Sequence, residues 1–323
     1  MGIWDLSVMR KRRILPGVAG VAGVAETSFG VGVEVLRHGK LSQTGGYYNT
    51  VDLAESGDIY LYASPQVSKV DADNVRVFAS NFGPENLEAA YNSRSDRVVF
   101  SGEYSAFYDA SNGTLETFFE NQTNGAVCAD PLSGDFFTGG QSEIRRYTDD
   151  ATLSNTGSRS GESARAVAID ASGAHFFVMY DDICRVGSAT LAVEDSFDAG
   201  APLQTKMLAT NGEILAFMTT DSFMHCYTSD FSHVWSREMV DYETVTDLEM
   251  DIYGDVYLAG EGAGNSARLR RYSGKSGELV IDIEAAAAWK LPMRTDGITG
   301  VSVNSAGLVA ACSDEYYRVL AQS

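Results

Sequence analysis

Short apolar stretches alternate with polar turns along most of the chain, and this arrangement repeats. Each unit has an apolar stretch, a turn with Asp, Ser or Gly, a second apolar stretch, and then an aromatic-rich stretch. Clear copies occupy residues 51–61, 127–137, 166–177 and 248–258, with looser copies around Asp96, Gly212 and Gly307. The lengths and residue types of these stretches are typical of β-strands joined by tight turns.

The repeat has a regular period. Its turns lie at residue 57, near 96, and at 134, 173, 212, 254 and 307. A period of about 40 residues with four short strands per unit is typical of a β-propeller blade. Seven turns therefore predict an all-β protein, a seven-bladed β-propeller. Glycine at most of these turns indicates a positive φ, and a preceding Asp can cap the turn.

The two ends of the repeat region predict how the ring closes. We expect blades near 46–81, 87–121, 125–158, 164–200, 202–240, 244–284 and 297–323. The last unit has room for three strands only. Residues 31–41 alternate like a strand and precede the first complete unit. We predict that this segment supplies the missing strand of the seventh blade and so removes exposed sheet edges.

The second half of each unit supports a family resemblance. Residues 106–115 and 269–280 both read as strand, turn and strand, and the first contains Tyr108-Asp109 followed by Gly113. With these turns the chain resembles quinoprotein-like and WD40-like propeller repeats over roughly residues 46–323. Such proteins carry a Trp in most blades, whereas here only Trp235 occupies such a place. The resemblance implies an architecture, and this fold hosts many functions.

Composition narrows the classes of function. The 323 residues include 44 Asp and Glu against 24 Lys and Arg, for a formal net charge of −20. So acidic a surface repels nucleic acid and anionic lipid. The longest weakly polar run, residues 14–25, is too short to cross a bilayer. Four cysteines in a chain of this length do not form a disulfide scaffold.

Two segments fall outside the repeat. Residues 1–30 form an extended arm with a basic cluster, and residues 284–290 favour a short helix in an insert before the seventh blade. Partner contacts are expected from residues of these two segments, namely Trp4, Arg10, Lys11, Arg12, Arg13 and Trp289. Packing of Trp289 over the propeller rim is the simpler alternative. Residues 10–25 also have features of a secretory signal, although Pro16 and three glycines interrupt the apolar part.

Catalytic motifs are not found. The histidines are His38, His175, His225 and His233; the last two fall on consecutive expected strands and could meet in space, with structural roles the simpler interpretation. The four cysteines form no CxxC pair and are expected to be small buried thiols on inner strands. Residues 274–276 look like the end of a phosphate loop but lie between two strands. Calcium at residues 71–74, or at Asp251 with Asp255, is a weaker alternative. We predict no catalytic, cofactor-binding or metal-binding residue.

Three functional hypotheses remain. The first is a non-catalytic interaction propeller whose arm docks to other subunits of a large assembly, in several copies if the assembly is symmetric. Virion proteins of tailed phages and archaeal viruses, on a tail or capsid surface, resemble this plan, which implies a virion location. The second is a secreted or periplasmic scaffold propeller. The third is a lactonase-like or quinoprotein-like enzyme with a site in the central channel.

Overall fold

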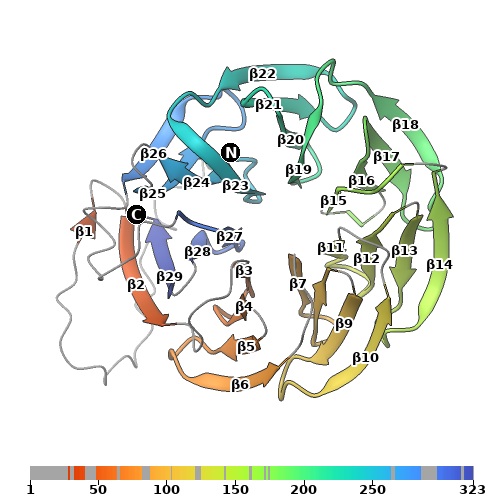
Figure 1. Cartoon of the computed structure of the whole chain (residues 1–323), viewed down its shortest axis with the longest axis vertical. Helices are drawn as coiled ribbons and strands as arrows, with labels where there is room; N and C mark the ends of the chain where they lie inside the picture. Colours follow the sequence, from red (N-terminus) through yellow and green to blue (C-terminus); the bar gives the residue numbers. More distant parts are fainter. Residues whose placement is uncertain are drawn as a thin grey trace, which may run out of the picture.

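The computed structural model describes most of the repeat region. The described residues are 28–29, 33–40, 49–63, 66–81, 88–102, 104–120, 125–141, 143–159, 162–170, 172–173, 175–262, 266–284, 297–313 and 316–322. Seven antiparallel sheets stand around a central opening, as Figure 1 shows. The predicted seven-bladed propeller is confirmed.

Within each of the first six blades the strands follow the chain from the axis outward. Blade 1 contains β3 (Asn49–Leu53), β4 (Ile59–Ala63), β5 (Gln66–Val70) and β6 (Arg76–Asn81). Blade 2 contains β7 (Glu88–Asn92), β8 (Arg97–Ser101), β9 (Tyr104–Asp109) and β10 (Leu115–Glu120). Blade 3 contains β11 (Ala126–Ala129), β12 (Phe136–Gly139), β13 (Glu143–Tyr147) and β14 (Leu153–Ser158). Blade 4 contains β15 (Ala166–Ile169), β16 (His175–Met179), β17 (Ile183–Gly187) and β18 (Val193–Phe197). Blade 5 contains β19 (Leu203–Thr210), β20 (Ile214–Thr219), β21 (Phe223–Thr228) and β22 (His233–Glu238). Blade 6 contains β23 (Tyr242–Met250), β24 (Val256–Gly262), β25 (Ser266–Tyr272) and β26 (Leu279–Glu284).

The seventh blade is built from both ends of the chain. It contains β27 (Gly300–Val303), β28 (Leu308–Cys312) and β29 (Tyr316–Gln322), and β2 (Val33–Lys40) pairs antiparallel with β29. The predicted closing strand is therefore confirmed. One further strand that the sequence did not predict lies at the outer edge of the same sheet, where β1 (Ser28–Phe29) pairs with β2.

The turns between first and second strands have the predicted conformation. Glycines at 57, 134, 173, 212, 254 and 307 all have positive φ, and Asp96 takes the same conformation in blade 2 with φ 51°. The residue three or four positions earlier caps several of these turns. Asp251 Oδ1, for example, accepts the backbone N–H groups of Tyr253 and Asp255, each at 2.9 Å.

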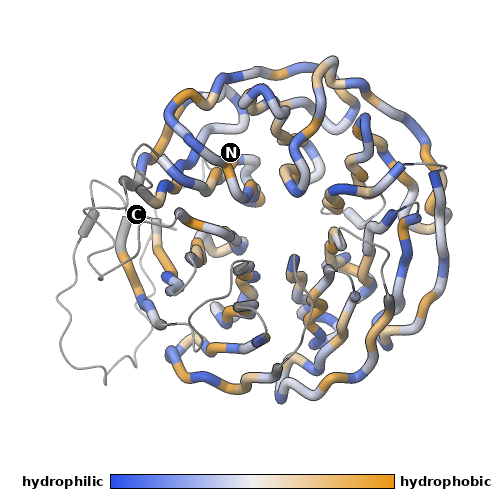
Figure 2. Tube along the Cα trace, in the orientation of Figure 1, coloured by the Kyte–Doolittle hydropathy of each residue, from blue (hydrophilic) through white to orange (hydrophobic). Residues whose placement is uncertain are grey.

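Burial depends on a strand's position within its blade. The second strands β12 and β20 are buried along their whole length, because neighbouring blades cover both of their faces. The outermost strands β14 and β18 are largely exposed, and hydrophobic and hydrophilic residues alternate along the outer ring in Figure 2. In all seven blades a break in register separates the third strand from its outer partner. Such bulges protect an exposed sheet edge from pairing with other chains.

At several junctions an outer strand packs on a turn of the next blade, and the residue sizes at these contacts are complementary. Trp235 of blade 5 covers Gly277 of blade 6, where a Cβ would lie 2.8 Å from the indole, and its Nε1 donates to the Gly274 carbonyl at 2.8 Å. At the junction of blades 3 and 4 the glycine is on the outer strand and the larger residue is in the turn. Gly157 of β14 faces Leu191 of blade 4, and Leu191 has φ 56°.

Candidate functional site

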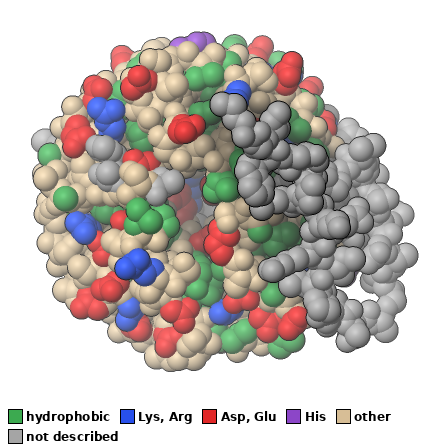
Figure 3. All heavy atoms as spheres, turned by 180° about the vertical axis from the view of Figure 1, so that it is seen from behind, with side chains coloured by type: hydrophobic (Ala, Val, Ile, Leu, Met, Phe, Trp, Pro, Cys, Tyr) green, Lys and Arg blue, Asp and Glu red, His purple; other side chains and the backbone are tan. Residues whose placement is uncertain are grey.

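The central channel gathers charged side chains from blades that are distant in the sequence. Its four carboxylates belong to inner strands: Asp52 on β3, Glu88 on β7, and Asp247 and Glu249 on β23. Asp247, Asp52 and Glu88 all interact electrostatically with Glu249. Acidic side chains are visible at the central opening in Figure 3. The channel is therefore the most densely charged inward-facing surface that we find in the described part of the chain.

Lys206 is the cation of this cluster. It lies on β19 of blade 5, where the register breaks between Leu203 and Leu208, and it has φ 68°. Its Nζ lies 4.0 Å from Glu88 Oε1 of blade 2. In Figure 1, β19 and β7 stand across the central opening from each other, so this ion pair crosses the channel. The two side chains are 30% and 21% exposed, which leaves the pair in contact with water.

Three of the carboxylates tie neighbouring blades together. Asp52 accepts the backbone N–H of Tyr91 in blade 2, and Glu88 accepts that of Val127 in blade 3 at 3.1 Å. Asp247 accepts the N–H of Val301 in blade 7 at 2.7 Å. Each carboxylate thus bonds to the inner strand that follows its own. Hydrogen bonds from amides to a charged acceptor are stronger than neutral ones.

Asp52 also reaches back to the seventh blade. Its Oδ1 accepts the Ser302 hydroxyl at 3.1 Å, so that one side chain links blades 7, 1 and 2. By contrast, the hydrogen bond that Glu249 accepts comes from the N–H of Met250, the next residue on its own strand. Glu249 therefore lines the channel without joining two blades.

Burial shifts the titration of these carboxyl groups. It raises the pKa of Glu249 to about 8, of Glu88 to about 7 and of Asp247 to about 6. The charge of Lys206 acts in the opposite direction on Glu88 and Asp247. Burial also raises the pKa of Asp52. At neutral pH the channel therefore holds both protonated and ionised carboxyl groups.

The sequence analysis did not find these residues, although one signal was available. When the repeats are aligned on the glycines of their first turns, Asp52 and Glu249 occupy the position of Ala129, Ala168 and Ser302 in blades 3, 4 and 7. A charge where other repeats have a small residue marks a special position. The four carboxylates and Lys206 meet only because the closed ring brings their blades together. The sequence of a single repeat does not show this.

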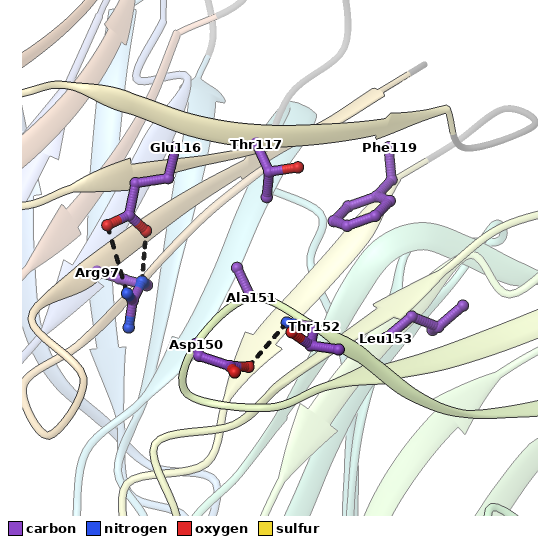
Figure 4. Close-up of a pocket in the computed structure, with 8 residues that line it drawn as sticks. All are labelled: Arg97, Glu116, Thr117, Phe119, Asp150, Ala151, Thr152 and Leu153. Atoms are coloured by element: carbon purple, nitrogen blue, oxygen red, sulfur yellow. Dashed lines mark hydrogen bonds and ion pairs between the residues drawn. The ribbon is translucent and has the colours of Figure 1, made fainter.

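A groove lies at the rim between blades 2 and 3 and has a volume of about 520 Å³ (Figure 4). Phe119, Ala151 and Leu153 give it an apolar side. On its polar side the guanidinium of Arg97 forms an ion pair with the carboxylate of Glu116, with Nε 2.5 Å from Oε2. Leu153 is 45% exposed. The charges of Arg97 and Glu116 are therefore paired with each other within the wall of the groove.

The proposed contact residues of the arm and insert, Trp4, Arg10, Lys11, Arg12, Arg13 and Trp289, lie outside the described residues. The expected helix at 284–290 also lies outside them, apart from Glu284 at the end of β26. Their partner contacts remain predictions.

The placement of the cysteines was predicted only in part. All four are free, and Cys184, Cys226 and Cys312 are buried. The expectation that they lie on inner strands is wrong for these three, which belong to β17, β21 and β28, because the second and third strands are sandwiched between blades and also favour small apolar groups. Cys128 lies on the inner strand β11. Burial raises the pKa of each thiol at Cys128, Cys184 and Cys226, which disfavours the reactive thiolate.

The other candidate motifs serve the turns. Residues 274–276 lie in the turn between β25 and β26, as their strand context predicted. Asp71 Oδ1 accepts the N–H groups of Asp73 and Val75, and Asp255 pairs with Arg271. Among the described residues, no three His, Cys, Asp or Glu side chains gather in an arrangement that would hold a metal ion. Nor does a helix with the length and hydropathy of a membrane span occur in the described ranges.

No protein-family model matches this sequence, and no curated protein matches it.

Proposed function

We propose that this chain is a non-catalytic structural or interaction propeller that works within a larger protein assembly. The observation that carries the proposal is the use of the channel carboxylates. Asp52, Glu88 and Asp247 each accept a backbone N–H from the following blade. Groups that hold the ring together are poor candidates for binding and releasing a substrate, since moving them loosens the blades.

The closure of the ring supports a scaffold role as well. The seventh blade joins β2 to β29 over the whole of β2, and Arg37 of β2 donates to the carbonyls of Gly57 and Asp71 in blade 1. The strand β2, which comes after the N-terminal arm in the sequence, is therefore firmly held in the disc. We propose that an arm anchored in this way carries the disc on a neighbouring subunit without loosening the blades.

A virion is the assembly that we propose, with the arm docking to other subunits of a tail or capsid. The resemblance in plan supports it, together with the basic arm on an acidic body: residues 1–30 have a net charge of +2 against −22 for the remainder. A secreted or periplasmic scaffold is the alternative, and it requires that the first residues are removed.

The native assembly tests this proposal. We expect the protein, extracted gently from its source, to migrate as a particle far larger than 34.8 kDa. Cross-linking should join residues 1–27 to a second kind of subunit. A chain without residues 1–27 should keep its melting temperature and lose the particle. A native protein that migrates as a free single chain would contradict the proposal, as would a truncated chain that still assembles.

One observation favours an enzyme as the second candidate. Glu249 and Asp247 lie on the same face of β23, with pKa values raised to about 8 and about 6. Carboxyl groups with pKa values on either side of neutrality are suited to act as general acid and base. Turnover of a lactone or ester panel that disappears in Glu249→Gln, with the fold intact, would favour this candidate over a scaffold.

A further inference from the structure

Blade 5 brings two histidines to one serine on its outer strands. His225 of β21 lies directly opposite Ser236 of β22. His225 Nδ1 lies 2.8 Å from Ser236 Oγ, and His233 Nε2 lies 2.9 Å from the same oxygen. A ring nitrogen of each histidine therefore converges on one point. Histidine side chains reach the surface at the rim of the disc in Figure 3.

The hydrogen bonds behind His225 fix its tautomer. The Thr219 hydroxyl donates to Asp221 Oδ1 at 2.5 Å. Because the hydroxyl hydrogen of Thr219 is engaged with Asp221, Thr219 Oγ1 accepts a hydrogen bond from His225 Nε2–H at 3.1 Å. The neutral imidazole therefore has its lone pair on Nδ1, which points at Ser236. A carboxylate acting through a hydroxyl in this way orients the ring as outer groups orient metal-binding histidines.

Aromatic contacts also hold the rings in place. His225 stacks on Phe217, with ring centroids 5.1 Å apart, and on Phe223 at 6.1 Å. His233 packs edge-on against Tyr227 at 5.1 Å. His233 and Ser236 are exposed, so an ion can reach them from solvent without opening the blade.

We propose that His225 Nδ1 and His233 Nε2 form a two-histidine site for a first-row divalent cation such as Zn²⁺, Ni²⁺ or Cu²⁺. Neutral imidazole is the ligand that these ions favour. Ser236 Oγ lies within 2.9 Å of both nitrogens and supplies an oxygen, and water completes the coordination. No third His, Cys, Asp or Glu in the described part of the chain completes the set, so the site should bind its ion reversibly. This proposal is independent of the proposed function.

Titration of the untagged full chain with Ni²⁺, followed by calorimetry, tests the site. We expect one equivalent to bind. His225→Ala and His233→Ala should each abolish that binding, and Thr219→Val should weaken it about 10-fold, since it frees the His225 ring. Ser236→Ala should still bind, because both nitrogens remain.

His38→Asn is the matched control, since it removes a histidine from the closing strand β2 and leaves the pair intact. It should bind Ni²⁺ as the unchanged chain does. His233 is exposed, so the His233→Ala variant should fold and tests the site even if His225→Ala unfolds. The proposal is overturned if the unchanged chain binds no Ni²⁺, if His233→Ala binds normally, or if His38→Asn weakens binding as much as His233→Ala.

Discussion

Replacing Glu249 by glutamine tests how much a negative charge on this side chain lowers the free energy of unfolding. The change removes one negative charge and keeps an oxygen that can accept the N–H of Met250, which donates to Glu249 at 3.0 Å. Burial raises the pKa of Glu249 from 4.5 to about 8, and Asp247, Asp52 and Glu88 add repulsion. In the unfolded chain the same carboxyl group titrates near its ordinary value.

The sign of the effect follows from proton binding. Between pH 4.5 and 8 the folded chain holds a proton on Glu249 that the unfolded chain has lost. The free energy of unfolding therefore falls as the pH rises through this window. At about 1.4 kcal/mol for each pKa unit, the ionised carboxylate costs at most about 5 kcal/mol. Water in the channel screens part of this charge, so we expect about 1–3 kcal/mol.

Thermal unfolding across a pH series is the assay. Glu249→Gln should raise the melting temperature by roughly 2–6 °C near pH 8, and the gain should shrink towards pH 5, where the native carboxyl is already protonated. Glu238→Gln makes the same change of charge on an exposed outer strand and should have little effect. A glutamine variant no more stable than the unchanged chain near pH 8, or equally stabilised at both pH values, would refute the reasoning.

Three further predictions concern the ring. Deleting residues 33–40 removes the strand that pairs with β29, so the melting transition should drop and broaden in calorimetry; an unchanged transition would show that closure does not need this strand. Gly277→Ala places a methyl group 2.8 Å from the Trp235 indole at φ 69°, and should cost about 2 kcal/mol or more in urea unfolding. Trp235→Phe loses the bond to the Gly274 carbonyl and should cost about 1 kcal/mol; a loss no larger than that of an exposed Trp would contradict the packing described.

The histidine pair shows where local reasoning ends. The sequence placed His225 and His233 on neighbouring strands, and that much proved right. Their convergence on Ser236 depends on the break in register between Cys226 and Tyr227, which shifts His233 relative to β21. Such a break is seen only when the pairing of the two strands is known, so strand patterns alone do not reveal it.

What the amino-acid sequence determined by itself was the number of blades, the turn positions and the closing strand. These features are local, because a tight turn needs a positive φ at a residue such as Gly57, and a strand needs only its own apolar pattern. The tertiary structure decided the channel. Lys206 meets Glu88 only because the ring brings blades 5 and 2 face to face. Repeats that look alike in sequence therefore bring different side chains to the channel once the closed ring directs their inner strands at one axis.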